Sequence, residues 1–281
     1  MMRKALAIAA VLGLASFAAA PAMADTTQAP LKDVHWSFEG PFGRFDQEQL
    51  QRGYKVYHDV CSACHSMSLL TYRNLGQKGG PFYDPKYPNP NDNPYVKTIV
   101  KDYQVPDIDT DTGDAIKRPA TAADTFVKPF PNEYAARASN GGALPPDLSL
   151  IVKAREGGPR YIYSILTGYV PAPAGMTVPT GKYYHPYMPG DMTSNWHGTG
   201  PVPEGGFISM PLQLTDDRVT YDDGTKATAS QEAQDVVAFL TWAAEPHADE
   251  RKTLGLSVLI FLVVFTGLLY ASYRSIWKDK H

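Results

Sequence analysis

The clearest helical pattern in this chain begins after residue 45. Asp46 is followed three residues later by Gln49, with apolar residues on either side, which is typical of a helix start with a capping box. In the helix that follows, Gly53, Tyr57 and Cys61 are each four residues apart and therefore share one face. A glycine on that face would let a second helix approach closely.

A second helical pattern near the end of the chain fits as the partner of the first. Thr228 and Gln231 resemble another capping box, an apolar run from 236 to 242 follows, and Pro246 lies just past the expected helix end. Aromatic and apolar residues in both helices are those that a helix crossing would bury. We therefore expect the two helices to cross at the face that carries Gly53.

Both ends of the chain carry apolar segments. Residues 1–24 combine two basic residues, a short apolar run and a small-x-small pattern, which predict a cleaved signal peptide. An N-terminal membrane anchor is the alternative, although the run is short for a span. Residues 251–274 include 21 consecutive uncharged positions, enough for a helix to cross a bilayer of roughly 30 Å. The alternative there is a buried core helix.

These segments predict a single-pass protein of the inner (plasma) membrane. We expect residues 25–250 to form an exported domain on the periplasmic side, residues 251–274 to form the transmembrane helix, and residues 275–281 to form a cytoplasmic tail.

Between the two helices the chain is rich in proline, glycine and polar residues. Residues 78–132 and 171–206 lack sustained periodicity and are expected to form long irregular connections. Residues 107–114 contain four aspartates and predict a solvated acidic loop; a calcium loop is the alternative, but its closing glutamate is missing. Residues 151–169 have helical spacing interrupted at 157–159 by Gly-Gly-Pro, which predicts two short helices.

Composition and charge exclude several classes of protein. The 281 residues include 24 Pro and 23 Gly, which argues against a long coiled coil. A net charge of -3 without a basic cluster argues against nucleic-acid binding. Residues 25–252 hold 21 Lys and Arg against 28 Asp and Glu, a balance of -7. Such a domain would steer a basic, mobile partner towards itself, although ordinary solubility charge is the alternative.

The chemistry of the chain is concentrated in Cys61-Ser62-Ala63-Cys64-His65, which contains both of its cysteines. Cys-x-x-Cys-His is the attachment pattern of c-type haem: two thiols form thioethers to the haem vinyl groups, and the histidine ligates the iron. A thioredoxin-like dithiol, half of a zinc site and a structural disulfide are the alternatives. Export favours haem attachment, and no second cysteine pair is present for zinc.

A helix that runs into Cys-x-x-Cys-His and is crossed by a C-terminal helix resembles class I cytochromes c. The resemblance implies an all-α haem domain, here with long irregular insertions, and a methionine as the second axial ligand. Met210 lies in the last loop before the closing helix, where this class carries that methionine, whereas Met67 is too close to His65 to reach the opposite face of the iron. Met188 and Met192 are the next candidates, Met176 is the remaining methionine after the motif and before the closing helix, and His185 and His197 follow as possible ligands.

Longer stretches resemble the cytochrome c1 family, the membrane-bound haem subunits of quinol–cytochrome c oxidoreductases, also called cytochrome bc1 complexes. The similarity covers most of residues 40–275. These stretches are Arg52–Tyr57 leading into Cys-Ser-Ala-Cys-His-Ser-Met, Ala136–Ser149, Val152–Arg155, Leu166–Tyr169 and Tyr221–Pro246.

The resemblance implies roles for individual residues. Cys61 and Cys64 would hold one haem c, and His65 and Met210 would ligate its iron. The backbone near Pro145 would orient His65. The residues that would line the haem and its propionates are Asn140, Arg155 and Tyr161. The guanidinium fork of Arg155 matches a propionate carboxylate, although a surface arginine is the alternative.

The resemblance also implies a function and partners. The chain would relay electrons from a Rieske-type iron–sulfur protein to a soluble c-type cytochrome, beside cytochrome b, in respiratory or photosynthetic electron transport, and would have no turnover site of its own. A membrane-tethered cytochrome c that donates electrons to a terminal oxidase is the alternative. A haem peroxidase is a third hypothesis, which requires an open iron position.

Overall fold

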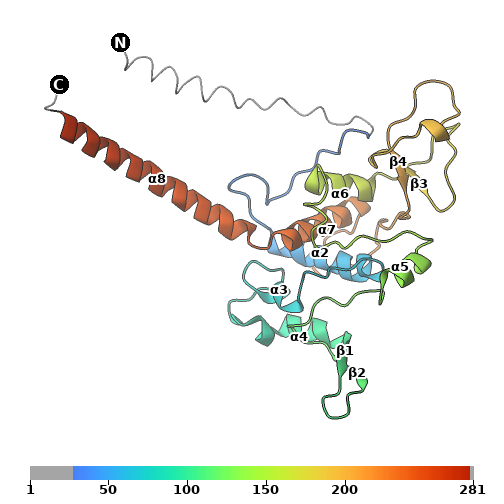
Figure 1. Cartoon of the computed structure of the whole chain (residues 1–281), viewed down its shortest axis with the longest axis horizontal. Helices are drawn as coiled ribbons and strands as arrows, with labels where there is room; N and C mark the ends of the chain where they lie inside the picture. The colour runs from blue at the N-terminus through green and yellow to red at the C-terminus, as the bar shows by residue number, and fades with distance from the viewer. Residues whose placement is uncertain (1–27, 279–281) are drawn as a thin grey trace.

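The structure is a computed structural model, which describes residues 28–278. Its regular structure is mostly helical (Figure 1). The α-helices are α2 (Gln47–Asp59), α3 (Tyr72–Gly76), α4 (Pro94–Lys101), α5 (Glu133–Ser139), α6 (Gly158–Thr167), α7 (Ala229–Ala244) and α8 (Ala248–Trp277). Two antiparallel strand pairs are added to them, β1 (Gln104–Ile108) with β2 (Ala115–Pro119), and β3 (Tyr183–His185) with β4 (Gly206–Ile208).

Helices α2 and α7 cross as the sequence predicts. The Asp46 side chain accepts hydrogen bonds from the first turn of α2, and the Thr228 hydroxyl caps α7 in the same way. A Cβ atom on Gly53 would lie 2.1 Å from the Asp235 carbonyl oxygen and 2.7 Å from Cβ of Phe239. The missing side chain at Gly53 therefore allows the two backbones to come this close, and both predicted helices are confirmed.

A buried carboxylate ties the crossing together. The side chain of Asp235 in α7 is fully buried and accepts hydrogen bonds from Arg52 Nε at 3.0 Å, Gln49 Nε2 at 3.1 Å and Gln231 Nε2 at 2.9 Å. Arg52 also donates to Asp223 at 2.7 Å. Because each oxygen of the buried Asp235 carboxylate has a partner, its burial does not leave an unpaired charge.

Helix α6 packs on α7 together with the segment that precedes α2. The Tyr163 and Ser230 hydroxyls form a hydrogen bond of 2.7 Å, and the Trp36 indole nitrogen donates to the Gln234 carbonyl at 3.0 Å. The Trp36 ring also meets Tyr163 edge to face. The core thus lies between α2, α6 and α7, with residues around Trp36 closing one side of it, and it continues beneath α3 and α4.

Residues 78–132 contain more regular structure than the sequence pattern predicts. Asn93 caps α4 by accepting from the next two backbone N–H groups, Pro94 is its first residue, and Val96 and Val100 are buried beneath it. The expectation of an irregular connection was wrong here, because a helix of eight residues between proline-rich turns shows too few apolar positions to reveal its period.

The acidic residues 107–114 lie on the β1–β2 hairpin, which projects from the domain (Figure 1). Asp107 forms an ion pair with Arg118 at 2.7 Å, and Asp109 accepts from backbone N–H groups of the turn at 2.8 and 3.3 Å. In β1 and β2 only Val105 is buried. Apart from Val105, both strands are therefore open to solvent and lack the alternation that marks a strand in sequence.

Residues 151–169 form one helix rather than two. Gly157, with φ +80°, is the N-cap of α6, and Pro159 lies in the first turn. Residues 151–155, where the first short helix was expected, form consecutive turns that bury Ile151 and Val152. Residues 171–206 were expected to be irregular, and they include β3 and the short 3-10 helix η4 (Thr193–Asn195) before they reach β4.

Helix α8 extends away from the rest of the domain (Figure 1). Among the residues that the structure describes, it is the helix that is long and apolar enough to cross a membrane, and the side chains of its apolar segment are exposed within that part of the chain. Arg44 donates to Thr253 Oγ1 at 2.8 Å, and the Lys252 amine reaches the carbonyls of Phe38 and Gly43. The predicted signal peptide, residues 1–24, and residues 279–281 of the predicted tail lie outside the described residues.

Candidate haem site

The Cys-x-x-Cys-His segment is a tight turn at the end of α2. The short 3-10 helix η2 (Cys61–Ala63) follows α2 after one residue, and the Cys61 carbonyl accepts hydrogen bonds from Cys64 N at 3.1 Å and His65 N at 2.9 Å. The Ser62 hydroxyl donates to the His58 carbonyl at 2.6 Å. Two thiols and one imidazole are thus presented by five consecutive residues, fixed to the end of the helix that crosses α7.

Neither cysteine is in a disulfide in the structure. Burial raises the pKa of the Cys61 thiol to about 12, and the neighbouring Cys64 adds to the effect. A dithiol oxidoreductase needs a thiol whose pKa is lowered, so that it reacts as a thiolate. The environment of Cys61 therefore differs from that of a thioredoxin-like site.

The imidazole of His65 is oriented by a backbone carbonyl. Its Nδ1 donates to the Pro146 carbonyl at 2.8 Å, which leaves Nε2 with its lone pair free for a metal. Burial lowers the pKa of His65, opposed by that hydrogen bond and by the charge of Asp147, and so favours the neutral form that ligates iron. The family resemblance implied such a role for the backbone near Pro145, and the hydrogen bond is made by the next residue along the chain.

Asp147 fixes the position of this carbonyl relative to His65. One carboxylate oxygen accepts from Ser66 Oγ and Ser68 N, each at 2.8 Å, and the other accepts from Ser149 N at 2.8 Å. Burial alone would raise the pKa of Asp147, but hydrogen bonds from Ser149 and Ser68 lower it to about 2. The residues after His65 and those after Pro146 therefore form one cross-linked unit.

Met210, Met188 and Cys61 are all partly buried and pack against the hydrophobic core. Met210 follows β4, and its carbonyl accepts from the Tyr169 hydroxyl at 2.8 Å. The Met188 sulfur accepts from the Tyr161 hydroxyl at 3.6 Å. The described contacts therefore commit the sulfur of Met188 to a tyrosine and engage only the backbone of Met210.

The remaining candidates for an axial ligand are placed unfavourably. Met67 and Met192 are buried, with exposed fractions of 0% and 2%. His185 is fully buried, and both of its ring nitrogens are engaged, Nε2 with the Ile165 carbonyl at 3.0 Å and Nδ1 with Tyr187 N at 3.3 Å. His197 lies on the surface of the 171–206 segment.

The three residues expected to line the haem lie on different elements. Tyr161, in α6, is buried, and burial raises its pKa while the nearby charge of Arg155 lowers it. Arg155 is exposed, and its guanidinium donates to the Ala154 carbonyl at 3.0 Å. Asn140 ends α5 and donates from Nδ2 to the Ala136 carbonyl at 2.7 Å. The structure thus places Arg155 near Tyr161 and gives Asn140 a local capping contact.

Sequence reasoning did not single out Pro146, Asp147 or Tyr169. All three stand in stretches that the family resemblance covers, Pro145-Pro146-Asp147 and Leu166-Thr167-Gly168-Tyr169. An Asp followed two residues later by Ser is typical of a local turn, which was the available signal for Asp147. A hydrogen bond between Tyr169 and Met210 spans 41 residues and leaves no local trace.

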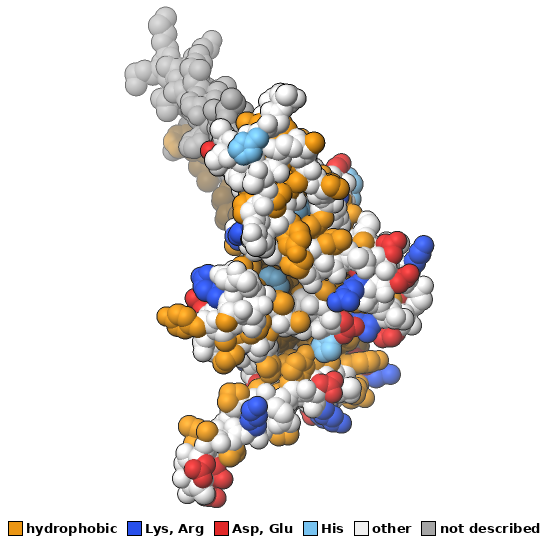
Figure 2. All heavy atoms as spheres, turned by 90° about the vertical axis from the view of Figure 1, so that its right-hand side faces the viewer, with side chains coloured by type: hydrophobic (Ala, Val, Ile, Leu, Met, Phe, Trp, Pro, Cys, Tyr) orange, Lys and Arg blue, Asp and Glu red, His pale blue; other side chains and the backbone are white. Residues whose placement is uncertain are grey.

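The donor set and its surroundings fit a haem. Two thiols, a neutral imidazole and a thioether sulfur are the ligands of a c-type centre. Large apolar residues beside the candidate ligands are exposed: Leu144, next to Pro145, by 36%, and Leu212, two residues after Met210, by 50%. Hydrophobic side chains gather across the middle of the face on the α5 side, between the β3–β4 end and the hairpin (Figure 2). An apolar macrocycle would cover such surface.

These features define a c-type haem protein with an apolar C-terminal helix suited to membrane anchoring. Residues 36–280 match the model of the cytochrome C1 family. The chain belongs to this family.

Relatives from bacteria and mitochondria are similar over most of the chain. A cytochrome c1 of Rhodospirillum rubrum is 45% identical over 263 residues, which cover 88% of this chain and 87% of the relative. A mitochondrial cytochrome c1 haem protein of Saccharomyces cerevisiae is 45% identical over 246 residues, which cover 87% of this chain and 69% of the relative. A Bradyrhizobium diazoefficiens protein named cytochrome b/c1 is 44% identical over 265 residues, covering 88% of this chain but only 35% of that longer protein.

Family membership confirms the function and the cofactor that the sequence predicts. The protein is a haem-containing electron-transfer subunit of the cytochrome bc1 complex, and its cofactor is haem c. A tethered donor to a terminal oxidase is not favoured. Which residues hold and ligate the haem stays a prediction.

Proposed function

We propose that residues 25–250 form a class I cytochrome c-like haem domain that relays electrons from a Rieske-type iron–sulfur protein to a soluble c-type cytochrome. Cys61 and Cys64 bind one haem covalently, and His65 and Met210 ligate its iron from opposite faces. Cytochrome b is the membrane partner. The haem supplies one-electron chemistry, and the protein supplies its ligands and an apolar environment.

The hydrogen bond from His65 Nδ1 to the Pro146 carbonyl is the observation that carries this proposal. It selects the tautomer whose Nε2 can ligate iron and fixes the plane of the ring. Asp147 holds the carbonyl in place through Ser66 and Ser68. The support comes from the residue directly after Pro146 and holds the ring in the orientation that a ligating histidine needs.

Tyr161, Arg155 and Asn140 serve the edge of the haem in this proposal. Arg155 offers a guanidinium fork to a propionate carboxylate, and Tyr161, whose hydroxyl donates to the Met188 sulfur in the structure, lies in a buried position nearby. Asn140 ends α5 with its side chain half-buried. Methionine as the second ligand raises the reduction potential, which suits an electron acceptor placed after quinol oxidation.

The same proposal assigns a topology. Residues 1–24 act as the signal peptide, residues 251–274 within α8 span the inner membrane once, and residues 275–281 form the cytoplasmic tail. Tyr270, Tyr273 and Trp277 then lie at one interface with Arg274 beside them, as aromatic and basic residues do at membrane boundaries. The haem domain lies on the periplasmic side.

Purification of the tagged chain from membranes of its own cells tests the relay function. We expect a c-type reduced-minus-oxidised spectrum, a haem stain that persists after denaturation, and co-purification of a b-type cytochrome and an iron–sulfur subunit. Quinol added to this complex should reduce the c-type haem and then a soluble cytochrome c. A c-type cytochrome that purifies with a terminal oxidase and without a b-type subunit would refute the proposal.

Two matched variants test the sixth ligand. Met210→Leu removes the proposed ligand, and Met188→Leu removes the other partly buried methionine of the same surface. We expect the reduction potential to fall in Met210→Leu and to stay close to that of the wild type in Met188→Leu, because only a bound thioether raises the potential. The opposite result would assign the ligand to Met188.

A further inference from the structure

The segment that carries Met210 is attached to the domain by side chains from outside it. Antiparallel pairing of β3 with β4 places Tyr183 opposite Ile208. Beyond the strand, the Lys182 amine donates to Ser209 Oγ at 2.6 Å, and the Tyr169 hydroxyl donates to the Met210 carbonyl at 2.8 Å. Tyr169 is thus the side chain that holds the backbone of the proposed ligand itself.

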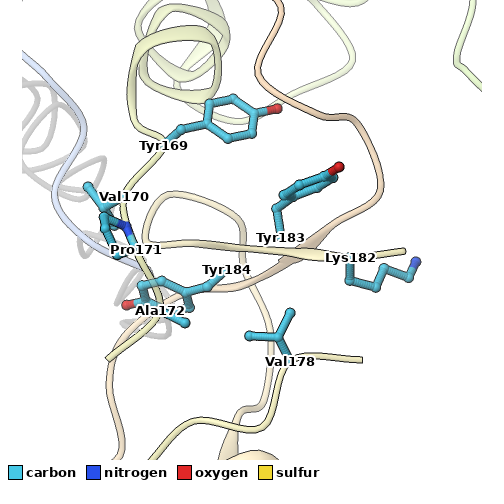
Figure 3. Close-up of a pocket in the computed structure, with 8 residues that line it drawn as sticks. All are labelled: Tyr169, Val170, Pro171, Ala172, Val178, Lys182, Tyr183 and Tyr184. Carbon is cyan, nitrogen blue, oxygen red and sulfur yellow. The ribbon is translucent and has the colours of Figure 1, made fainter. Parts of the chain in front are cut away.

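Tyr169 and its neighbours line a pocket of about 350 Å³ between the end of α6 and β3 (Figure 3). Figure 3 shows Tyr169 apart from Val170 and Ala172, with its hydroxyl directed away from them. The pocket also contains Tyr184, whose hydroxyl donates to the Glu204 carbonyl at 2.7 Å. Two tyrosines of one pocket therefore make hydrogen bonds of the same kind, to two different parts of the chain.

The ring of Tyr169 is fixed by contacts on the α6 side. It packs edge to face against the His185 ring, with the two ring centroids 4.9 Å apart, and His185 Nε2 donates a hydrogen bond to the Ile165 carbonyl of α6. A Cβ atom on Gly168 would lie 2.4 Å from the Tyr187 ring, so the residue before Tyr169 must be small for this arrangement to close. The position of the Tyr169 hydroxyl is consequently fixed relative to α6.

We infer that Tyr169 is a positioning residue for the axial methionine, which restrains Met210 through its backbone carbonyl and so holds the thioether at the iron. The inference rests on the proposed function, in which Met210 is the sixth ligand. Tyr169 does not touch the iron, and its effect should appear wherever an added ligand competes with the thioether.

The expected size of the effect follows from one hydrogen bond. If Tyr169→Phe removes that bond from the ligated state and leaves the dissociated state unchanged, the thioether becomes easier to displace. The net worth of a neutral hydrogen bond corresponds to about a two- to tenfold change in this equilibrium. The apparent affinity of the oxidised haem for imidazole should rise by the same factor.

Imidazole titration of the full-length, haem-loaded protein in detergent tests the inference, with the visible spectrum as the readout. Tyr169→Phe should bind imidazole about two- to tenfold more tightly than the wild type. The matched control is Tyr184→Phe, which loses a tyrosine-to-carbonyl bond in the same pocket but leaves Met210 untouched. Its imidazole affinity should stay at the wild-type value.

Two results would overturn the inference. One is an imidazole affinity of Tyr169→Phe equal to that of the wild type. The other is an equal rise of the imidazole affinity in Tyr169→Phe and Tyr184→Phe, which would show that loss of either tyrosine bond in this pocket weakens the axial ligand and that the bond to Met210 has no special role.

Met210→Leu separates this failure from a failure of the ligand assignment. If it binds imidazole more tightly than the wild type while Tyr169→Phe does not, Met210 remains the ligand and Tyr169 loses its role. If the wild type binds as tightly as Met210→Leu, Met210 is not the ligand and both ideas fail. If Met210→Leu loses its haem, the far-red sulfur-to-iron charge-transfer band of the wild type serves as the test of methionine ligation instead. The presence of this band supports methionine ligation, and its absence refutes methionine ligation.

Discussion

A methyl group added at Gly53 should destabilise the haem domain. In Gly53→Ala the new Cβ would lie 2.1 Å from the Asp235 carbonyl oxygen and 2.7 Å from Cβ of Phe239, whereas ordinary contacts begin at 3.4 Å. Both neighbours belong to α7, and one of them is backbone, so no side-chain rotation relieves the overlap. Helices α2 and α7 would have to move apart.

The magnitude is the difference between two effects. Overpacking a core typically lowers the free energy of unfolding by about 1–3 kcal/mol, whereas replacing glycine by alanine inside a helix raises it by about 1 kcal/mol. Because the clash is with rigid backbone, the packing cost should lie at or beyond the top of that range. We therefore expect a net loss of about 2 kcal/mol, which for a domain of this size lowers Tm by roughly 4–8 °C.

Thermal unfolding of the full-length protein in detergent measures this change, with circular dichroism and haem absorbance followed together. Gly255→Ala in α8 is the matched control, because its added methyl meets no atom within 4 Å and should leave the Tm of the haem domain unchanged. If Gly53→Ala unfolded at or above the wild-type temperature, the close helix crossing would be wrong.

Three further predictions concern charge. Asp235→Asn keeps the shape of the buried carboxylate but leaves Arg52 without its buried partner, and should cost roughly 3 kcal/mol in a denaturant titration, whereas a loss below about 1 kcal/mol would mean that the pair is dispensable. The pKa of Asp147 is lowered to about 2, so this carboxylate contributes fully to the stability of the fold above the pKa of about 4 of an unfolded aspartate, and the contribution is lost as the pH falls from there towards 2. Asp147→Asn should remove this part of the acid unfolding curve. An acid unfolding curve identical to that of the wild type would contradict the assignment. Residues 25–252 carry a balance of -7, so reduction of a basic soluble cytochrome c should slow steadily as salt is added, and a flat response would exclude electrostatic steering.

The elements that could be predicted from sequence are those with a local signal. A capping residue, helical spacing and a glycine on the contact face were enough to place α2 and its crossing with α7. The Cys-x-x-Cys-His segment was equally readable, because haem attachment requires fixed spacing within five residues. Helix α4 and the hairpin were missed, since a short helix and solvated strands have little hydrophobic pattern.

The parts of the site that could not be predicted depend on contacts between distant residues. The Pro146 carbonyl meets His65 across 81 residues, and Tyr169 meets Met210 across 41. A backbone carbonyl carries no side-chain signature, so sequence alone indicated only the neighbourhood of Pro145. Family resemblance supplied the candidate ligands, and the fold supplied the groups that orient them.

Mass spectrometry of the Cys61–Cys64 segment tests the central claim most directly. Trypsin should release residues 56–73 as one peptide, because cleavage sites follow Lys55 and Arg73. The account predicts that this peptide, taken from protein purified out of its own membranes, carries the mass of one haem bound through both sulfurs. Recovery of the same peptide with two free thiols, or with a disulfide between them, would contradict it.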